Sequence, residues 1–225
     1  MRRVSRLLGW LKRYGGVTVY LPPATRLLHC NGTNGATTLV DSSAANATVS
    51  VFASAQLSTA QVKYGSASLD LTGAGNPYVS LPIPSINVRT ASFTFQGWFR
   101  PTANGDNVFF TLLDSSDRLY LQQIAGTLYL GDGFTNPIAS TFTFTAAAWV
   151  HVAVTFDGAT YSVWIDGALF ASTTTLLTAA TPTTLQVGGR NLTAKYFAGY
   201  VDECAWYDGV CAYVAPFVPP LSEVI

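Results

Sequence analysis

The clearest pattern along the chain is a run of alternating apolar and polar positions from Trp149 to Phe170, WVHVAVTFDGATYSVWIDGALF. Two Asp-Gly pairs, at 157–158 and 166–167, divide this run into three segments. Asp-Gly supplies the positive φ angles that a two-residue hairpin turn needs, and β-branched and aromatic residues in the flanking segments favour strands. The run therefore predicts an antiparallel meander of three strands.

Within the first segment, successive side chains are expected to point to opposite faces of the sheet. One face is predicted to belong to the core because it carries only apolar residues, namely Val150, Val152, Val154 and Phe156. The other face carries Trp149, His151, Ala153 and Thr155.

Short apolar or alternating runs continue through the rest of the chain after residue 25, and each is bounded by turn residues such as Asn31-Gly32 and Gly188-Gly189. This spacing is typical of an all-β sandwich with many hairpins. We expect strands near 26–30, 48–52, 67–71, 78–81, 92–100, 107–113, 118–124, 127–130, 140–144, 149–156, 160–165, 168–174, 184–187 and 197–207.

Length and composition agree with one large β domain. A chain of 225 residues can form a single sandwich with a substantial core. Charged residues make up 11% and apolar residues 49%, which is not the composition of a disordered chain. No stretch approaches the roughly 20 continuous apolar residues of a membrane span.

Charge is distributed unevenly along the chain. The first 26 residues contain six basic and no acidic residues, whereas the remaining 199 contain six basic and twelve acidic residues and so carry −6. Val4, Leu7, Leu8 and Leu11 have the spacing of one helical stripe. We therefore divide the chain into a basic amphipathic arm (1–25, containing a short helix), a β-sandwich (26–214) and a Pro-rich tail (215–225). The residues of the arm expected to bind a partner are Arg2, Arg3, Val4, Arg6, Leu7, Leu8, Trp10, Leu11, Lys12 and Arg13.

Four functions remain open for this arm. A secretory signal would need a continuous apolar region, which Lys12 and Arg13 interrupt. A membrane-surface helix would use the basic and apolar faces together with Trp10. Nucleic-acid binding would use the charge, although few aromatic residues are interleaved with it. We favour docking on a neighbouring protein or on the acidic body of this chain, and we expect no nucleic-acid partner.

Four segments together resemble a known family: SFTFQGWFRP (92–101), AWVHVAVTFDGATYSVWIDG (148–167), LQVGG (185–189) and GYVDECAWYDG (199–209). In order and spacing they are similar to the laminin-G-like branch of the concanavalin A-like lectins and glucanases. The resemblance covers roughly 27–213 and implies a two-sheet antiparallel jelly roll. The segments at 27–44 and 55–82 are similar in particular to modules in virion proteins of tailed bacteriophages.

The fold does not determine the chemistry, so we searched for reactive residues. Glycoside hydrolysis needs two carboxyl groups about 5–9.5 Å apart. Asp202 and Glu203 are neighbours on a predicted strand and are expected to face opposite ways, and the E-x-D-x-x-E pattern of the glucanases is absent. His29 and His151 have no evident nucleophile nearby, and we interpret both as satisfied, partly buried histidines. We expect no catalytic residues and no enzymatic activity.

The resemblance implies one candidate for a bound ion, a structural calcium held by Asp and Asn oxygens. Asp41 and Asp202 match acidic positions of the family pattern, and Asn76 stands where the family often has Asp. Neutral residues at this and two other family positions, Thr72 and Asn31, weaken the attraction for Ca²⁺, which prefers several carboxylates. The alternative for Asp202 is hydrogen bonding to backbone amides. We expect no other metal and no cofactor.

Cysteines and aromatic residues give weaker signals. Three cysteines, an odd number, do not form a disulfide framework. We expect Cys30 and Cys204 to be buried thiols, and Cys211 remains a candidate for an intermolecular link. A glycan site would need exposed aromatic rings near turns, and Tyr78, Phe134 and Tyr196 are the candidates.

From these observations we expect a non-enzymatic structural protein of a phage virion, assembled in the host cytoplasm. A capsid decoration or accessory protein is the leading hypothesis, and a tail protein comes next. Its partners would be other virion proteins, such as the major capsid or tail protein, in a homo-oligomeric or multi-copy assembly. The alternative is a carbohydrate-binding adhesion module of a tail fibre or cell surface.

Overall fold

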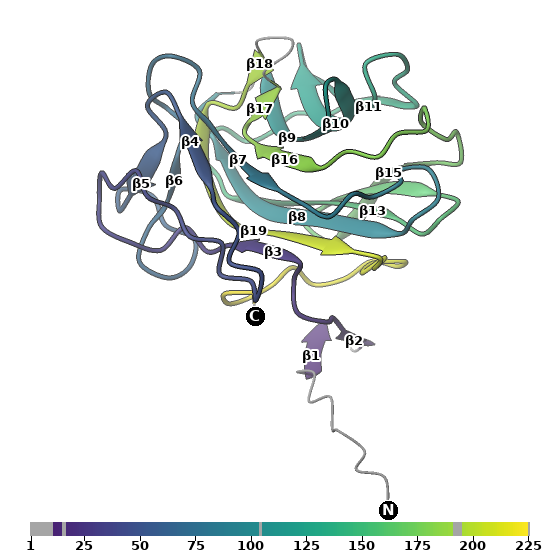
Figure 1. The fold of residues 1–225 in the computed structure, drawn as a ribbon, viewed down its shortest axis with the longest axis horizontal. Coiled ribbons are helices and arrows are strands. Elements are labelled where there is room, and N and C mark those ends of the chain that lie inside the picture. Colours follow the sequence, from purple (N-terminus) through teal and green to yellow (C-terminus); the bar gives the residue numbers. More distant parts are fainter. Residues whose placement is uncertain (1–10, 15–16, 104, 191–194, 225) are drawn as a thin grey trace, which may run out of the picture.

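The computed structural model describes residues 11–14, 17–103, 105–190 and 195–224, and they form a sandwich of two antiparallel sheets (Figure 1). In spatial order, the seven-stranded sheet contains β12 (Ile138–Thr141), β11 (Thr127–Gly131), β10 (Asp117–Ile124), β9 (Asn107–Leu113), β16 (Thr184–Val187), β7 (Tyr78–Pro82) and β4 (Ser50–Phe52).

The eight-stranded sheet forms the other layer. Its order is β15 (Ala168–Thr173), β14 (Tyr161–Ile165), β13 (Val150–Phe156), β8 (Phe93–Pro101), β19 (Gly199–Asp208), β6 (Ser68–Asp70) and β5 (Gln56–Ser58). The eighth strand, β3 (Arg26–Leu28), pairs with β19 beyond the point where β6 ends, so that Cys204 faces Leu28 in the register. The first and last strands of the body are therefore neighbours.

Two small hairpins complete the described strands: β1 (Leu11–Tyr14) with β2 (Val17–Tyr20), and β17 (Gly189–Arg190) with β18 (Lys195–Tyr196). Each of the fourteen predicted strands overlaps an observed one, and the all-β sandwich is confirmed. The strand expected near 140–144 lies slightly earlier, as β12. The sequence did not predict β1, β2, β5, β17 and β18, because segments of two to four residues leave too little alternation to recognise.

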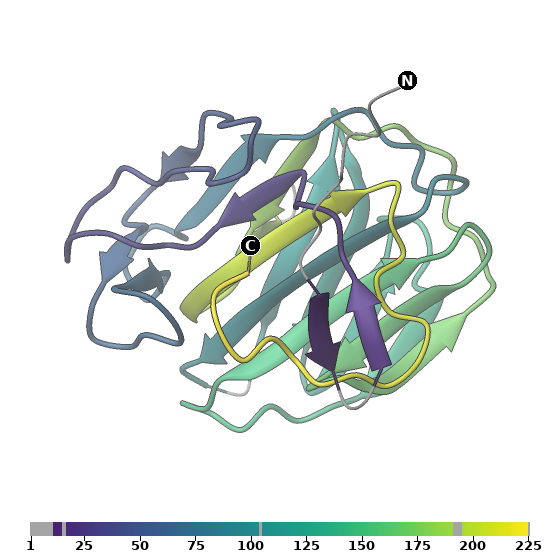
Figure 2. The ribbon, with the colours of Figure 1, turned by 90° about the horizontal axis from the view of Figure 1, so that it is seen from below.

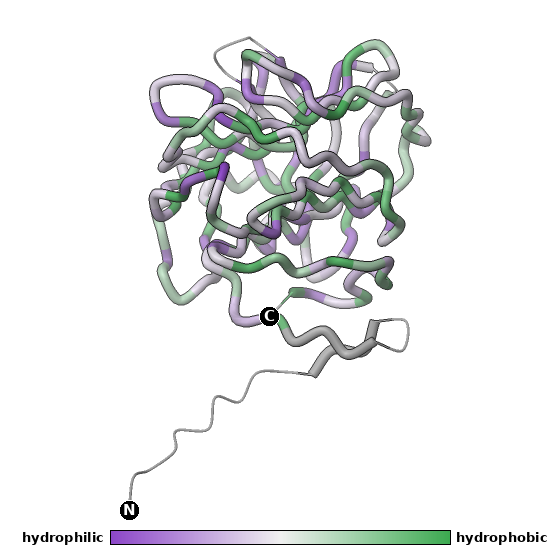
Figure 3. The backbone as a smooth tube through the Cα atoms, turned by 90° about the vertical axis from the view of Figure 1, so that its right-hand side faces the viewer, coloured by the Kyte–Doolittle hydropathy of each residue, from purple (hydrophilic) through white to green (hydrophobic). Residues whose placement is uncertain are grey.

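The core lies between the two sheets. Val150, Val152, Val154 and Phe156 all belong to one buried hydrophobic cluster, as the alternation predicts. Phe95 of β8 stacks on Phe110 of β9 with ring centroids 4.1 Å apart and so links the two layers. Apolar and polar stretches alternate along the chain in both layers (Figure 3). Burial of this apolar surface is the main stabilising contribution to such a fold.

The outer face of the eight-stranded sheet is also covered, which the sequence did not predict. His151, Ala153 and Thr155 are as deeply buried as their core-facing neighbours. Residues 210–224 cross this face as a third layer (Figure 2). We call these residues the C-terminal strap.

Hydrogen bonds hold the strap along its whole path. It begins at β8, where Thr94 Oγ1 donates to the carbonyl of Val210 at 2.7 Å. Over the far strands, the amide of Phe217 donates to the carbonyl of Gly167 at 2.9 Å. The ring of Phe217 stacks on Tyr213 with centroids 3.5 Å apart and meets Trp164 edge-on. The Pro-rich tail expected at 215–225 is therefore packed against the body.

The N-terminal segment lies differently. The strands β1 and β2 pair with each other and project from the body (Figure 1). The predicted helical stripe is wrong where it can be checked, because Leu11, Lys12 and Arg13 lie in β1. The other arm residues, Arg2, Arg3, Val4, Arg6, Leu7, Leu8 and Trp10, lie outside the described residues. In the part of the chain that the structure describes, nothing forms a helix with the length and hydrophobicity of a membrane span.

Candidate functional site

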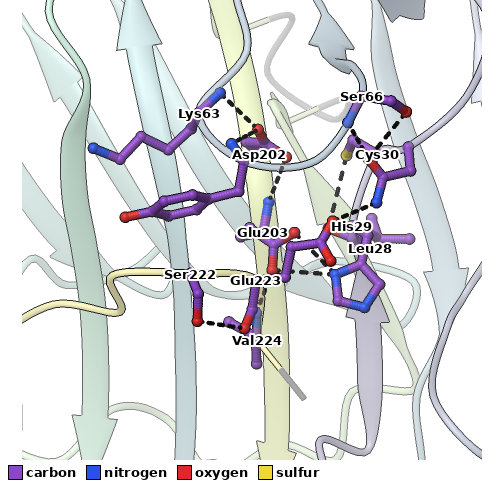
Figure 4. Close-up of polar contacts among 12 residues, drawn as sticks. Leu28, His29, Cys30, Lys63, Ser66, Asp202, Glu203, Ser222, Glu223 and Val224 are labelled. Carbon is purple, nitrogen blue, oxygen red and sulfur yellow. Dashed lines mark hydrogen bonds and ion pairs between the residues drawn. The ribbon is translucent and has the colours of Figure 1, made fainter.

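A cluster of polar side chains lies where β3, β19 and the end of the C-terminal strap meet (Figure 4). The register of β19 against β8 shifts between Asp202 and Ala205, and Glu203 has a positive φ of 52°. A bulge of this kind redirects side chains relative to a regular strand. As a result, both Asp202 and Glu203 are buried, with exposed fractions of 0% and 1%.

Asp202 accepts hydrogen bonds from backbone amides. Its Oδ2 accepts from the amides of Lys63 at 3.0 Å and Tyr64 at 3.1 Å, and its Oδ1 accepts from that of Glu203 at 3.0 Å. Burial nevertheless disfavours the charged carboxylate and raises the pKa of Asp202 to about 7. The carboxyl group thus fixes the 63–64 loop to β19. This confirms hydrogen bonding to backbone amides, which was the alternative to calcium binding for Asp202.

Glu203 points toward His29 and the strap. Its Oε1 lies 2.9 Å from His29 Nδ1, and its Oε2 accepts from the amide of Val224 at 2.6 Å. The hydrogen bond to Glu203 raises the pKa of His29 despite partial burial. His29 is therefore a satisfied, partly buried histidine, as predicted.

The sequence did not predict that Glu223 joins this cluster. One ligand atom each from His29, Glu203 and Glu223 lie within 4.8 Å of one another. Asn31 Nδ2 donates to Glu223 Oε1 at 2.6 Å and so orients that carboxylate. Glu203 and Glu223 are the only two glutamates in the chain. The rarity of this residue type was the one available signal, and nothing in their sequence positions indicates that the two side chains meet.

This cluster does not have the arrangement of a glycosidase. Two carboxyl groups that cleave a glycosidic bond must have the substrate between them. The side chain of Glu203 is fully buried, and its two oxygens are occupied by His29 and by the amide of Val224. The geometry is instead that of a network that fastens the strap to the sheet.

The three calcium candidates do not form a site. Asp41 is buried, and its two oxygens accept from the amides of Leu27 at 2.9 Å and Ala47 at 2.9 Å. Burial opposes ionisation of Asp41, but these amides outweigh it and lower its pKa. The oxygens of Asp202 are likewise occupied by amides, and Asn76 lies in an exposed loop before β7. Asp41 and Asp202 thus each hold backbone amides of the body.

His151 contradicts its prediction as a satisfied histidine. Its side chain is buried against Trp98 and Phe217, and neither ring nitrogen has a hydrogen-bond partner among the described residues. Burial lowers the pKa of His151 to about 3. The imidazole is therefore neutral at physiological pH and contributes to packing beneath the strap.

The cysteines are free thiols. Cys30 and Cys204 are buried, as expected, and burial raises the pKa of both well above the ordinary value. Cys211 is partly exposed, and its pKa is also raised by burial. A thiol with a raised pKa is a poor nucleophile because little thiolate is present.

Two of the three aromatic candidates for glycan contact lie together at one end of the sandwich. Tyr78 is buried, with an exposed fraction of 6%, so the expectation of an exposed ring is wrong for this residue, whereas Tyr196 is partly exposed. Tyr78 stacks on Phe52, with ring centroids 4.3 Å apart, and its centroid is 6.0 Å from that of Tyr196. We call these three rings the aromatic rim. Phe134 is 74% exposed but lies beyond β11, separated from β7 by three strands.

A hollow of about 280 Å³ opens beside the aromatic rim. Its polar lining includes Thr72, Asn76 and an ion pair in which Lys195 Nζ lies 2.6 Å from Asp106 Oδ2. The hydrogen bond from Lys195 lowers the pKa of Asp106, which favours the carboxylate form of that side chain. The hollow thus combines aromatic surface with donors and acceptors.

Comparison with known proteins identifies relatives of the fold. Residues 72–212 match a family model described as the concanavalin A-like lectin/glucanases superfamily. No curated protein matches the sequence.

Three solved structures illustrate the structural likeness. The binding domain of botulinum neurotoxin serotype G has 14% identity and a TM-score of 0.64, with 84% of this chain and 48% of that chain covered. The serotype D domain in complex with N-acetylneuraminic acid has 13% identity and a TM-score of 0.59, with coverage of 82% and 47%. The third structure is of botulinum neurotoxin type C, whose cell entry depends upon interaction with two ganglioside molecules. It has 14% identity and a TM-score of 0.56, with 82% of this chain and 47% of that chain covered. The chain thus spans about half the length of these structures, and at such identity the likeness concerns the fold alone.

Proposed function

Because the chain belongs to the concanavalin A-like lectin/glucanases superfamily, we propose that it is a non-enzymatic structural module of a phage virion. In this proposal it is a capsid decoration or accessory protein, attached through its N-terminal segment. The observation that carries the proposal is the contrast between a body closed by its own C-terminal strap and an N-terminal hairpin that projects from it (Figure 1).

We propose that the module is not an enzyme because of how its buried carboxylates are bound. Among the described residues, five acidic groups are buried. Asp41, Asp132, Asp202 and Glu203 accept hydrogen bonds from backbone amides, and Asp117 is paired with Arg190. A carboxylate whose oxygens already accept hydrogen bonds within the protein is poorly placed to transfer a proton to or from a substrate.

Attachment would depend on charge and on apolar contact. Residues 1–20 contain five basic and no acidic residues, so the N-terminal segment suits an acidic surface on a neighbouring subunit. Arg26, the sixth basic residue among the first 26 residues, lies in β3 and is paired with Asp41 of the body. The resemblance of the body to modules in virion proteins of tailed bacteriophages supports a virion as the setting. Multiple copies on one particle would supply the avidity that a short segment lacks.

Particle incorporation tests this attachment. A chain without residues 1–20 should fold normally but fail to co-purify with assembled particles. Residues from Leu21 onward are kept because Leu21 packs against the body. Arg89→Gln, which removes an exposed basic residue of the body, should not affect incorporation. Normal incorporation of the shortened chain would rule out the N-terminal segment as the anchor.

A second candidate function is glycan recognition at the aromatic rim. The specific observation is the partly exposed ring of Tyr196, supported by Tyr78 behind it, at the edge of a hollow that is lined by hydroxyl, amide and ion-pair groups. Aromatic faces stack on sugar rings, and a few polar groups determine orientation. Two structural neighbours are described with sialic acid or ganglioside ligands, which supports testing acidic glycans first.

A glycan array with the full-length chain tests this candidate. Saturable binding that Tyr196→Ala abolishes and Phe134→Ala leaves unchanged would support the aromatic rim. Phe134 is the matched control because it is an exposed aromatic residue away from the rim. An absence of saturable binding, or equal loss in both variants, would exclude it.

A further inference from the structure

The cluster of His29, Glu203 and Glu223 combines donor atoms in a way that the proposed functions do not use (Figure 4). We propose that it is a binding site for a divalent transition-metal ion of the Zn²⁺ class, which joins the C-terminal strap to β3 and β19. The three ligands come from three segments that are distant in sequence. The site would therefore exist only in the folded chain.

The donor atoms of His29, Glu203 and Glu223 all lie within 4.8 Å of one another, so small side-chain shifts would bring them to one ion. His29 Nδ1 lies 2.9 Å from Glu203 Oε1 and 3.1 Å from Oε2. Metal–ligand bonds of about 2.1 Å place neighbouring ligands roughly 3.0–3.4 Å apart. One imidazole and two carboxylates favour Zn²⁺, Mn²⁺ or Co²⁺ over Ca²⁺, which takes six to eight oxygen ligands.

Carboxyl groups outnumber cationic groups in the cluster. Glu203 and Glu223 place two carboxyl groups around one imidazole, and Glu203 is buried. Among the described residues, the only ion pair of this group joins His29 to Glu203. The nearby ammonium of Lys63 lies over the ring of Trp98, 3.7 Å from its centroid. Burial of carboxylates is costly without a compensating cation, and a divalent ion would supply the charge.

Outer contacts already orient two of the ligands. The amide of Val224 donates to Glu203, and Asn31 donates to Glu223, each at 2.6 Å. Asn31 is itself held by the amide of Ser66 at 2.6 Å. Support of this kind is typical of metal ligands and commonly contributes about 10–100-fold to metal affinity. Gly65 makes the close approach possible, because a Cβ there would collide with both Asn31 and Glu223.

Solvent can reach the cluster from two sides. His29 and Asn31 line a hollow of about 180 Å³, and Glu223 lines a second of about 500 Å³ together with Tyr64 and Leu221. These hollows provide a route for the ion and space for water ligands. With three protein ligands, a tetrahedral ion would bind one water.

Metal titration of the full-length chain tests the proposal. Isothermal titration with Zn²⁺ should give one saturable site, and Co²⁺ should give the absorption bands of a nitrogen- and oxygen-ligated ion. We expect His29→Gln and Glu223→Gln each to weaken binding by at least about tenfold, since each removes a ligand. The control variant is Asp114→Asn, which removes a partly exposed carboxylate outside the cluster. It should bind Zn²⁺ with the affinity of the wild type.

The variants also distinguish loss of the site from loss of the fold. Glu223 is partly exposed, and its replacement by Gln preserves shape, so this variant should retain the wild-type circular dichroism spectrum. Equal metal affinity in Glu223→Gln and wild type would overturn the proposal. A thiolate-to-Co²⁺ charge-transfer band would also overturn it, because the metal would then be bound by the cysteines.

Discussion

The β1–β2 hairpin and the C-terminal strap lie on the same side of the eight-stranded sheet but are held in different ways (Figures 1 and 2). The C-terminal strap packs aromatic residues onto the sheet and donates backbone hydrogen bonds to it. The hairpin of β1 and β2 pairs mainly with itself. The comparison teaches that a segment without regular secondary structure can be an integral layer, whereas a regular hairpin can be peripheral.

The largest expected effect is on the strap. Phe217→Ala should lower the free energy of unfolding by about 3 kcal/mol, because a buried aromatic ring is lost and a cavity remains. Chemical denaturation measures this change. Leu221→Ala is the matched control, since Leu221 belongs to the same segment but is 77% exposed. A loss below about 1 kcal/mol for Phe217→Ala would mean that the strap is not an integral layer.

The strap should also make stability depend on pH through His151. The folded pKa is about 3, below the ordinary value of 6.5, so the unfolded chain binds a proton that the folded chain does not. Stability from this residue is therefore lost as the pH falls below 6.5. Between pH 7 and pH 5 the loss should be about 2 kcal/mol. His151→Leu should remove this component, and identical pH profiles for the two proteins would contradict the burial.

Substitution of two glycines by alanine distinguishes the cost of a collision with the strap from the cost of backbone strain. Gly167 and Gly126 both have a φ of +79°, but a Cβ at Gly167 would collide with the carbonyl of Phe217, whereas Gly126 has open space. Gly126→Ala should cost about 1 kcal/mol for the conformation alone. Gly167→Ala should cost a further 1–2 kcal/mol because the strap must move. Equal melting curves for the two variants would show that the strap adapts freely.

The smallest expected effect concerns the N-terminal hairpin. Deletion of residues 1–20 should change the free energy of unfolding by less than about 0.5 kcal/mol, because the body retains its core and strap. Denaturation of the shortened chain measures this value. A loss comparable to that of Phe217→Ala would mean that the hairpin, like the strap, is part of the body.

Most of the body could be predicted from the sequence because alternation and turn residues are local signals. The third layer could not, because nothing local indicates that the apolar residues of 210–224 face this chain's own sheet. The two histidines illustrate the same limit. The pairing of His29 with Glu203 depends on a bulge in β19, and the isolation of His151 depends on Phe217 covering it.

The candidate site was the least predictable part. For Asp202, the sequence left calcium binding and hydrogen bonding to amides as alternatives, and the structure shows the second. The meeting of Glu203 with Glu223 requires the strap to return to β3 after crossing the sheet. Contacts between such distant segments follow from tertiary packing. Neither the composition of the chain nor the spacing of its residues indicates these contacts.

The position of β19 between β8 and β3 has a consequence for biosynthesis. The eight-stranded sheet lacks an interior strand until residue 208 has emerged from the ribosome, and the strap follows only after that. Nascent chains would then expose the edges of β8 and β3 during translation, and such edges are prone to mispairing. Closure of this sheet should therefore be a late step in folding, and a chaperone that shields strand edges would raise the yield of the domain.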